Sequence, residues 1–182
     1  GNYFFFSYGN DERFFFTSPH IIDFLFSYRK GWLLYTPIMV FAMIGIFFLK
    51  RKVKELKLVV PLIVIITVYV FSSWWAWWYG GSFGMRSMVH YYVLLAFPLA
   101  ALVSVCAKNT AAVISAGTIF VLLVGLNVRQ VVQYKHNMIH WDGMTKEAYW
   151  FSFDHPKFEA EDWPIFDSYL ERPDYATAKK IQ

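Results

Sequence analysis

Four apolar stretches dominate this chain of 182 residues, at residues 32–49, 58–73, 88–106 and 111–128. Each contains or approaches the roughly 20 residues that a helix needs to cross a hydrocarbon core of about 30 Å. Because that core offers no water to backbone groups, such segments are expected to be helices. Hydrophobic residues make up 57% of the chain and charged residues 16%, compared with about 45–50% and about 25% in soluble domains. We therefore predict an all-α integral membrane protein with four transmembrane helices, since a soluble bundle would need polar helix faces that these stretches lack.

Aromatic residues narrow the class further. Phe, Trp and Tyr make up 21% of the chain, which suits a protein whose rings gather at membrane interfaces. The composition excludes a disordered chain, a nucleic-acid-binding arm and a disulfide scaffold. A single cysteine, Cys106, can form no disulfide within the sequence. We expect membrane lipid, and no nucleic acid, as a partner.

Basic residues in the connections predict the orientation. Five of the eight residues at 50–57 are Lys or Arg, and the turn at 107–110 carries Lys108. Short basic loops stay in the cytoplasm, so both connections are expected to face inward. The sequence then divides into an extracytoplasmic aromatic segment, a four-helix transmembrane region and an extracytoplasmic tail, at residues 1–30, 31–128 and 129–182.

Two cations precede the first apolar stretch. Arg29 and Lys30 stand just before Gly31, although cations are favoured at the C-termini of helices. They serve either as anchors whose charged ends reach the membrane surface or as ligands for an anion such as phosphate, which suits a helix N-terminus. The sequence leaves both interpretations open.

The outward loop at residues 74–87 is the most specific feature and reads WWAWWYGGSFGMRS. Aromatic faces stack on sugar rings and also bury polyprenyl chains, while glycines let a backbone approach a ligand closely. Exposed N–H groups in such a turn can hold an anion, and the planar guanidinium of Arg86 suits bidentate recognition of phosphate. The loop predicts a lipid-phosphate or sugar site. The plainer alternative is an aromatic anchor, a turn and one surface arginine.

Two motifs carry a family resemblance. The first is FSYRKGWLLYTP at residues 26–37, and the second is WWAWWYGGSFGMRSMVHYYVLLAFPLA at residues 74–100. They resemble motifs of integral-membrane glycosyltransferases of the GT-C fold, in particular bacterial family 39-like enzymes related to dolichyl-phosphate-mannose protein mannosyltransferases. The resemblance covers roughly residues 3–130.

The resemblance implies a polyprenyl-phosphate sugar as donor and an acceptor hydroxyl on a lipid, glycan or protein. It implies a bacterial inner membrane, with both ends of this chain extracytoplasmic. Arg86, Arg29 and Lys30 would bind the donor phosphate. The donor sugar and lipid would be bound by Trp74, Trp75, Trp77, Trp78, Tyr79, Gly80, Gly81, Ser82, Gly84 and His90.

The catalytic residue is not assigned within this chain. Members of the resembled group carry an acidic residue in the first outward loop of a chain with more helices, so we expect these residues to be the C-terminal part of a longer enzyme. Asp11, Glu12 and Asp23 are outward carboxylates that are chemically able to act as a general base, although solvated loop acids are the plainer interpretation. No cofactor is predicted, and metal dependence of the full enzyme is left open. The alternative function is a non-catalytic membrane module that binds lipid phosphate or partner helices.

The tail from residue 129 onward is more polar and is expected to be a small appendage outside the membrane. Residues 146–150 are predicted to be helical, and Pro156, Pro164 and Pro173 are expected to break later stretches. His136 and His140 have the spacing of a metal pair on a helix, but no third ligand follows, and the sequence predicts no metal site.

Overall fold

The computed structural model describes residues 12–49 and 55–179, and this part of the chain is all-helical without a strand. One isolated antiparallel bridge joins Phe14 to Trp74. The elements, in chain order, are α1 (Ile21–Phe26), α2 (Trp32–Tyr35), α3 (Ile38–Gly45), η1 (Ile46–Phe48), α4 (Leu56–Ser72), η3 (Arg86–Tyr91), α5 (Tyr92–Cys106), α6 (Thr110–Lys135), α7 (Lys146–Asp154), α8 (Asp162–Tyr169) and α9 (Tyr175–Ala178).

In the part of the chain that the structure describes, two helices are long and apolar enough to cross a membrane. One is the continuous segment Arg86–Cys106, formed by η3 and α5, and the other is α6. Only 11% of the most apolar window of the first is buried within the chain, and none of that of α6. Apolar side chains exposed over such a length indicate contact with lipid or with another chain. These two helices favour the predicted membrane protein.

The other two apolar stretches form shorter helices, so the structure supports the four predicted spans only in part. The stretch at 32–49 is divided into α2, α3 and η1 because Thr36, with φ −139° and ψ 63°, leaves the helical conformation before Pro37. At 17 residues α4 is about 26 Å long. It stops at Ser72 because the following residues pair with the segment before α1, where Phe15 N–H donates to the Ser73 carbonyl at 2.6 Å.

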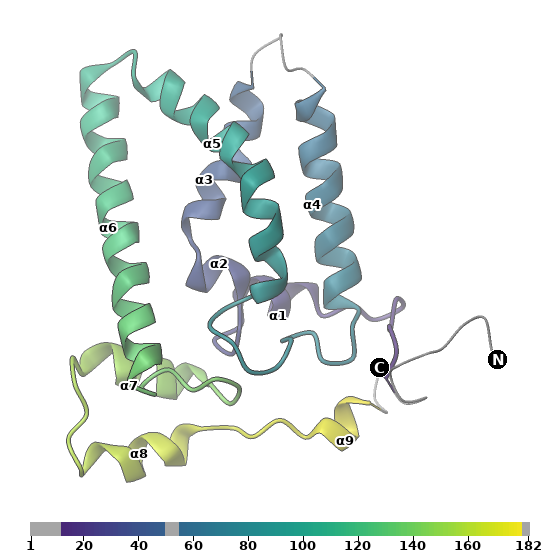
Figure 1. Cartoon of the computed structure of the whole chain (residues 1–182), viewed down its shortest axis with the longest axis vertical. Coiled ribbons are helices and arrows are strands. Elements are labelled where there is room, and N and C mark those ends of the chain that lie inside the picture. Colours follow the sequence, from purple (N-terminus) through teal and green to yellow (C-terminus); the bar gives the residue numbers. More distant parts are fainter. Residues whose placement is uncertain (1–11, 50–54, 180–182) are drawn as a thin grey trace, which may run out of the picture.

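α3 and α5 form the closest helix pair. A methyl group added at Gly45 of α3 would lie 2.0 Å from the carbonyl oxygen of Pro98 in α5, so only glycine permits this approach. The axis of α5 changes direction part-way along its length (Figure 1), as expected of a helix that contains a proline. Most of the buried apolar side chains lie among α1–α5 and the loop at residues 74–85, called here the aromatic loop.

The connections sort to opposite ends of the helices. The end of η1, the start of α4 and the turn from α5 to α6 lie at one end (Figure 1). α1, the aromatic loop and the C-terminal tail lie at the other end. The orientation predicted from the basic connections stays a prediction, since residues 50–54 lie outside the described residues.

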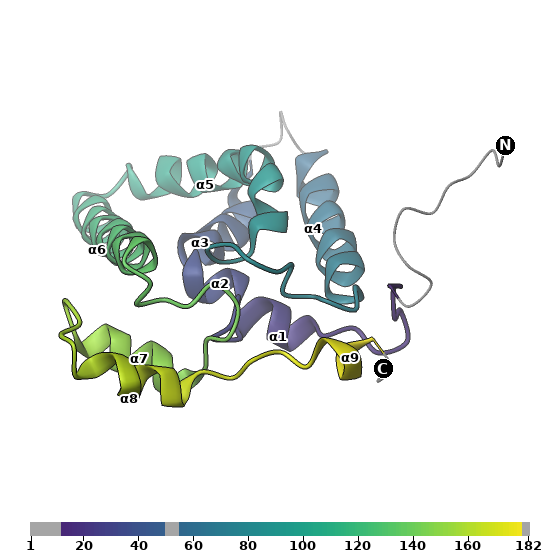
Figure 2. The same ribbon diagram turned by 60° about the horizontal axis from the view of Figure 1, so that its bottom comes forward.

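The tail folds back beneath the end of the helices that carries α1 and the aromatic loop, which we call the aromatic end. Figure 2 shows α7 and α8 side by side, with the chain running on to α9, where Tyr175 packs against Trp75 and Trp78. The last turns of α6 hold α7, because Gln130 donates to the Tyr149 hydroxyl at 2.8 Å and Gln133 to the Ser152 carbonyl at 2.5 Å. The predicted helix at 146–150 is confirmed within α7. Pro164 does not break a helix, because it lies in the first turn of α8, where a missing N–H costs little.

Candidate functional site

The two sequence motifs meet at one hydrogen-bonded contact. Lys30, with 1% of its surface exposed, donates from Nζ to the carbonyl oxygen of Ser82, and its Nζ lies 3.5 Å from the Ser82 hydroxyl. The neighbouring guanidinium of Arg29 lies 5.0 Å from the centre of a Trp78 ring. Because 52 residues separate Lys30 from Ser82, this contact ties the segment before α2 to the aromatic loop.

Backbone conformation fixes the shape of the loop at 74–85. Gly80 and Gly84 have φ of 63° and 54°, and Tyr79 adopts 55°, which is uncommon for a residue with a side chain. A methyl group added at Gly84 would lie 3.1 Å from Cβ of Tyr35, so a larger residue would crowd this approach. Gly81 is exposed at the surface of the turn. These conformations turn the carbonyl of Ser82 toward Lys30.

The tryptophans of the loop pack mainly against protein. Trp75, Trp77 and Trp78 are 8%, 7% and 4% exposed, and Trp74 packs against Phe14 at a ring-centre distance of 4.7 Å. In this arrangement the indole rings build the loop and leave little face open for stacking. A sugar in contact with this end of the molecule would meet the backbone of Gly80–Ser82 and the charged side chains around it.

Arg86 is the accessible cation of this cluster. It begins η3, and its side chain is exposed. Among the residues that the structure describes, its guanidinium has neither an ion pair nor a hydrogen bond. His90 is also exposed in η3, but no hydrogen bond joins it to Arg86 within the described chain, so its predicted role stays a prediction.

The tail contributes two residues that sequence analysis missed, Asp142 and Tyr175. Asp142 is 1% exposed and accepts a hydrogen bond at Oδ2 from the Tyr175 hydroxyl, while its Oδ1 is buried without a hydrogen-bond partner in the described chain. Tyr175 also packs on Trp78 at 6.0 Å. The run Trp141-Asp142-Gly143, an acid between an aromatic residue and a glycine, is the signal that could have indicated this turn.

The electrostatics of the cluster are dominated by buried charge. Burial lowers the pKa of Lys30 to about 8, an effect opposed by the negative charge of Asp142 and reinforced by Arg86 and Arg29. The three predicted phosphate ligands therefore lie close enough to influence one another. Lys30 remains largely protonated at neutral pH, so the cluster carries three positive charges against the single charge of Asp142.

His140 has a structural role in the described chain. α6 ends at Lys135, so no helix face carries both His136 and His140. The Nδ1 of His140 accepts hydrogen bonds from the backbone N–H groups of Asp142 at 3.1 Å and Gly143 at 2.7 Å. Burial lowers the pKa of His140, which favours the neutral ring that these two bonds require. His140 thereby fixes the turn that presents Asp142.

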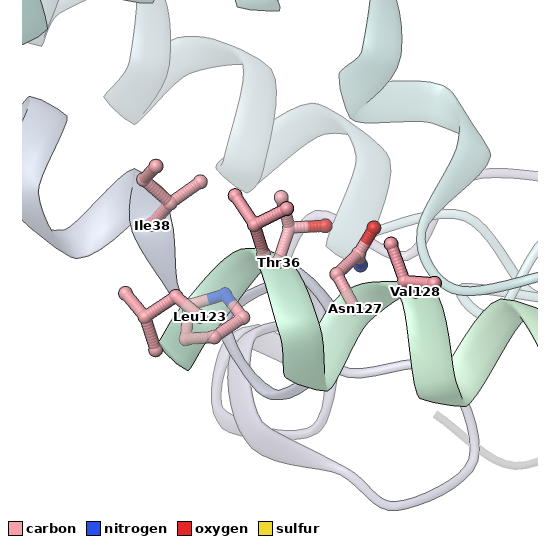
Figure 3. A pocket seen from close by; sticks show the side chains of 7 residues that line it. Thr36, Ile38, Leu123, Asn127 and Val128 are labelled. Atoms are coloured by element: carbon pink, nitrogen blue, oxygen red, sulfur yellow. The ribbon is translucent and has the colours of Figure 1, made fainter. Parts of the chain in front are cut away.

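A separate pocket of about 130 Å³ lies between α6 and the break that separates α2 from α3 (Figure 3). Asn127 of α6 donates to the Tyr35 carbonyl at 2.8 Å beside it. The pocket is lined by Thr36, Pro37, Ile38, Leu123, Val124, Asn127 and Val128. No charged residue is among the residues that line it, and Thr36 and Asn127 are its polar ones.

The outward carboxylates that sequence analysis considered are engaged elsewhere. Glu12 pairs with Lys179 at 3.1 Å, and Asp23 pairs with His20 at 3.0 Å. Asp11 lies outside the described residues.

Comparison with known proteins adds no relative. No protein-family model, no curated protein and no solved structure matches this chain.

Proposed function

We propose that this chain is part of a membrane glycosyltransferase that transfers a sugar from a polyprenyl-phosphate donor to an acceptor hydroxyl. The observation that carries the proposal is the bond from Lys30 to Ser82, which brings together the two motifs that resemble GT-C enzymes. Arg29, Lys30 and Arg86 then form one basic cluster at the aromatic end of the helices. Such a cluster suits the phosphate of a lipid-linked sugar.

In this proposal the aromatic end faces the extracytoplasmic side of a bacterial inner membrane. The η3–α5 segment and α6 cross the bilayer, and α4 and the interrupted segment formed by α2, α3 and η1 provide the two shorter crossings. Basic residues of the connections at 50–57 and 107–110 stay inside. The apolar pocket beside α6 then lies below the basic cluster, where the polyprenyl chain of a donor would run.

The cationic residues act on the leaving group. When the bond between sugar and phosphate breaks, the phosphate gains negative charge, and fixed cations stabilise that charge as it develops. Arg86 is accessible to make such contacts, while Lys30 holds the loop and adds to the local potential. The general base for the acceptor hydroxyl is left unassigned in this chain.

A non-catalytic module that binds lipid phosphate is the second candidate. It is favoured by the contacts of the two described carboxylates, since Glu12 forms an ion pair with Lys179 and Asp23 contacts His20 at 3.0 Å. Both candidates share the phosphate site. They differ in whether the complete native protein turns over a lipid-linked sugar, which a radiolabelled transfer assay in membranes measures.

Arg86→Ala tests the shared phosphate site. We expect the affinity for polyprenyl phosphate in nanodiscs to fall by about 30-fold, since hydrogen bonds to charged groups contribute roughly 1.5–3 kcal/mol. Tryptophan fluorescence provides the titration signal. Thermal unfolding should be unchanged, because the Arg86 side chain is exposed.

Lys108→Ala is the matched control, because it removes a cation from an exposed site at the opposite end of the helices. Its affinity should equal that of the wild type. Equal affinities for Arg86→Ala and the wild type would overturn the assignment of Arg86.

The pH dependence follows from Lys30. Because its pKa is about 8, its charge is lost as the pH rises from 7 to 9.5, and the affinity for polyprenyl phosphate should fall by about fivefold, or roughly 1 kcal/mol.

The free energy of unfolding should instead rise with pH. The folded state binds fewer protons than the unfolded state between the folded pKa and the ordinary value of 10.5, so stability contributed by Lys30 rises across that range. Lys30→Met should flatten the affinity profile, and an unchanged profile in this variant would assign the effect to another group.

A further inference from the structure

Two buried charged residues, Lys30 and Asp142, bear on how a sugar would be recognised beside the basic cluster. The inference from them rests on the proposed function and extends it from the phosphate to the sugar. Lys30 and Asp142 are each 1% exposed. Within residues 12–49 and 55–179, Asp142 bonds to Tyr175 through Oδ2 and Lys30 bonds to Ser82, and neither side chain has a further hydrogen-bond partner. Both charged groups keep unused hydrogen-bonding capacity, although buried polar groups are normally satisfied.

Two chains of contacts link Asp142 to Lys30, whose pKa is influenced by the charge of Asp142. Ser82, which accepts from Lys30, follows Gly81, and a methyl group added at Gly81 would lie 3.1 Å from the ring of Trp141, next to Asp142. On the other side, Trp78 lies between Arg29 and Tyr175, and Tyr175 donates to Asp142. The charged atoms of Lys30 and Asp142 nevertheless lie more than 4.0 Å apart, since they form no ion pair.

The chemistry of the two groups selects what fits between them. An ammonium only donates hydrogen bonds, and a carboxylate only accepts them. A phosphate diester, which only accepts, would be repelled by Asp142, and a second ammonium would be repelled by Lys30. A hydroxyl both accepts and donates, so it satisfies the two groups at once.

We propose that Lys30 and Asp142 bind one hydroxyl group of a sugar, which accepts a hydrogen bond from Lys30 Nζ and donates one to Asp142 Oδ1. The phosphate of the same lipid-linked sugar is bound on the exposed side of the cluster, at Arg86. Asp142 is thus a binding residue for the sugar, and Tyr175 and His140 are positioning residues that hold its carboxylate and its turn. The ring of Trp141, 48% exposed, lies against Gly81 next to this turn.

The test uses glycosides without phosphate. Saturation-transfer NMR is recorded on the full chain in nanodiscs with the methyl glycosides of mannose, glucose, galactose and arabinose. We expect saturable binding of at least one glycoside, weakened at least tenfold by Asp142→Asn and retained in Arg86→Ala. Asn preserves the size of the side chain but presents an N–H group toward Lys30 or loses the acceptor for Tyr175. Absence of saturable binding for all four glycosides, or equal affinities of Asp142→Asn and the wild type, would overturn the proposal.

A second series needs no variant and applies even if Asp142→Asn fails to fold. The bound glycoside is replaced by its single deoxy and fluorodeoxy analogues on the wild-type chain. One position should lose at least tenfold in affinity with both analogues, because fluorine cannot donate to Asp142. Equal affinities across the series would overturn the proposal.

The two proposals fail separately. Glycoside binding without any effect of Arg86→Ala on polyprenyl phosphate would overturn the phosphate site and leave the hydroxyl site standing. Polyprenyl phosphate binding that depends on Arg86, without glycoside binding, would overturn only the hydroxyl site.

Discussion

Gly45→Ala is expected to destabilise the protein by about 3 kcal/mol, at the upper end of what overpacking costs in a core. The added methyl group would lie 2.0 Å from the Pro98 carbonyl oxygen, and the nearest atoms are backbone, which cannot rotate aside. α3 and α5 must then separate along their contact. Thermal unfolding in a fixed detergent measures the loss.

Gly117→Ala in α6 is the matched control and should raise the stability of the protein instead of lowering it. It makes the same change in a helix where no atom lies within 4 Å of the added methyl group. Alanine is favoured over glycine in a helix by about 0.8–1.0 kcal/mol, so this variant should unfold at a higher temperature. Equal effects of the two variants would show that α3 and α5 do not pack as described.

Gly31→Ala is expected to weaken both the fold and the phosphate site. Its methyl group would lie 2.5 Å from the Ser27 carbonyl oxygen, which accepts the Gly31 N–H at 2.7 Å. The turn that delivers Lys30 to Ser82 must open. We expect a loss of about 2 kcal/mol in stability and a fall of at least tenfold in affinity for polyprenyl phosphate.

The control for this variant is Gly125→Ala, at another α6 position with open space around it. It should preserve the affinity and slightly raise the stability. If Gly31→Ala lowered the stability without changing the affinity at temperatures where it is folded, the turn would be structural and Lys30 would not contribute to the site.

The helical class was predictable from local sequence. The break at Pro37 was not predicted, since the apolar stretch at residues 32–49 was expected to form one helix, although proline is a local signal for such a break. A run of apolar residues without polar faces has few alternatives to helix, and proline disrupts the residue before it whatever the surroundings. The lengths of the helices were not predictable in the same way. α4 ends at Ser72 because residues 73–75 pair with residues 13–15, and such a pairing between distant segments leaves no mark in a hydropathy profile.

The cations of the candidate site were predictable from the sequence, but its carboxylate, that of Asp142, was not. Arg29, Lys30 and Arg86 stand out because positive charge is unusual beside an outward helix end. Asp142 lies in a tail with many other acids, and what distinguishes it is its burial and its electrostatic influence on Lys30, which is distant in the sequence. The tryptophans stood out in the sequence, but their environment was not predictable. The number of aromatic residues in the loop suggested open faces for stacking, whereas the rings of Trp75, Trp77 and Trp78 are buried and pack the loop.

The 26 residues of α6 make a rod of about 39 Å, but its apolar part at residues 111–128 is only about 27 Å long, close to the thickness of a hydrocarbon core. Its polar last turns are fastened to α7 through Gln130 and Gln133, and Asn127 fastens it to Tyr35. In the proposed membrane setting, the tilt of such a helix depends on the thickness of the lipid. A change of tilt would move the tail, and Asp142 with it, relative to the loop that holds Arg86. We therefore expect the proposed ligand affinities to respond to acyl-chain length, even when no residue of the site is changed.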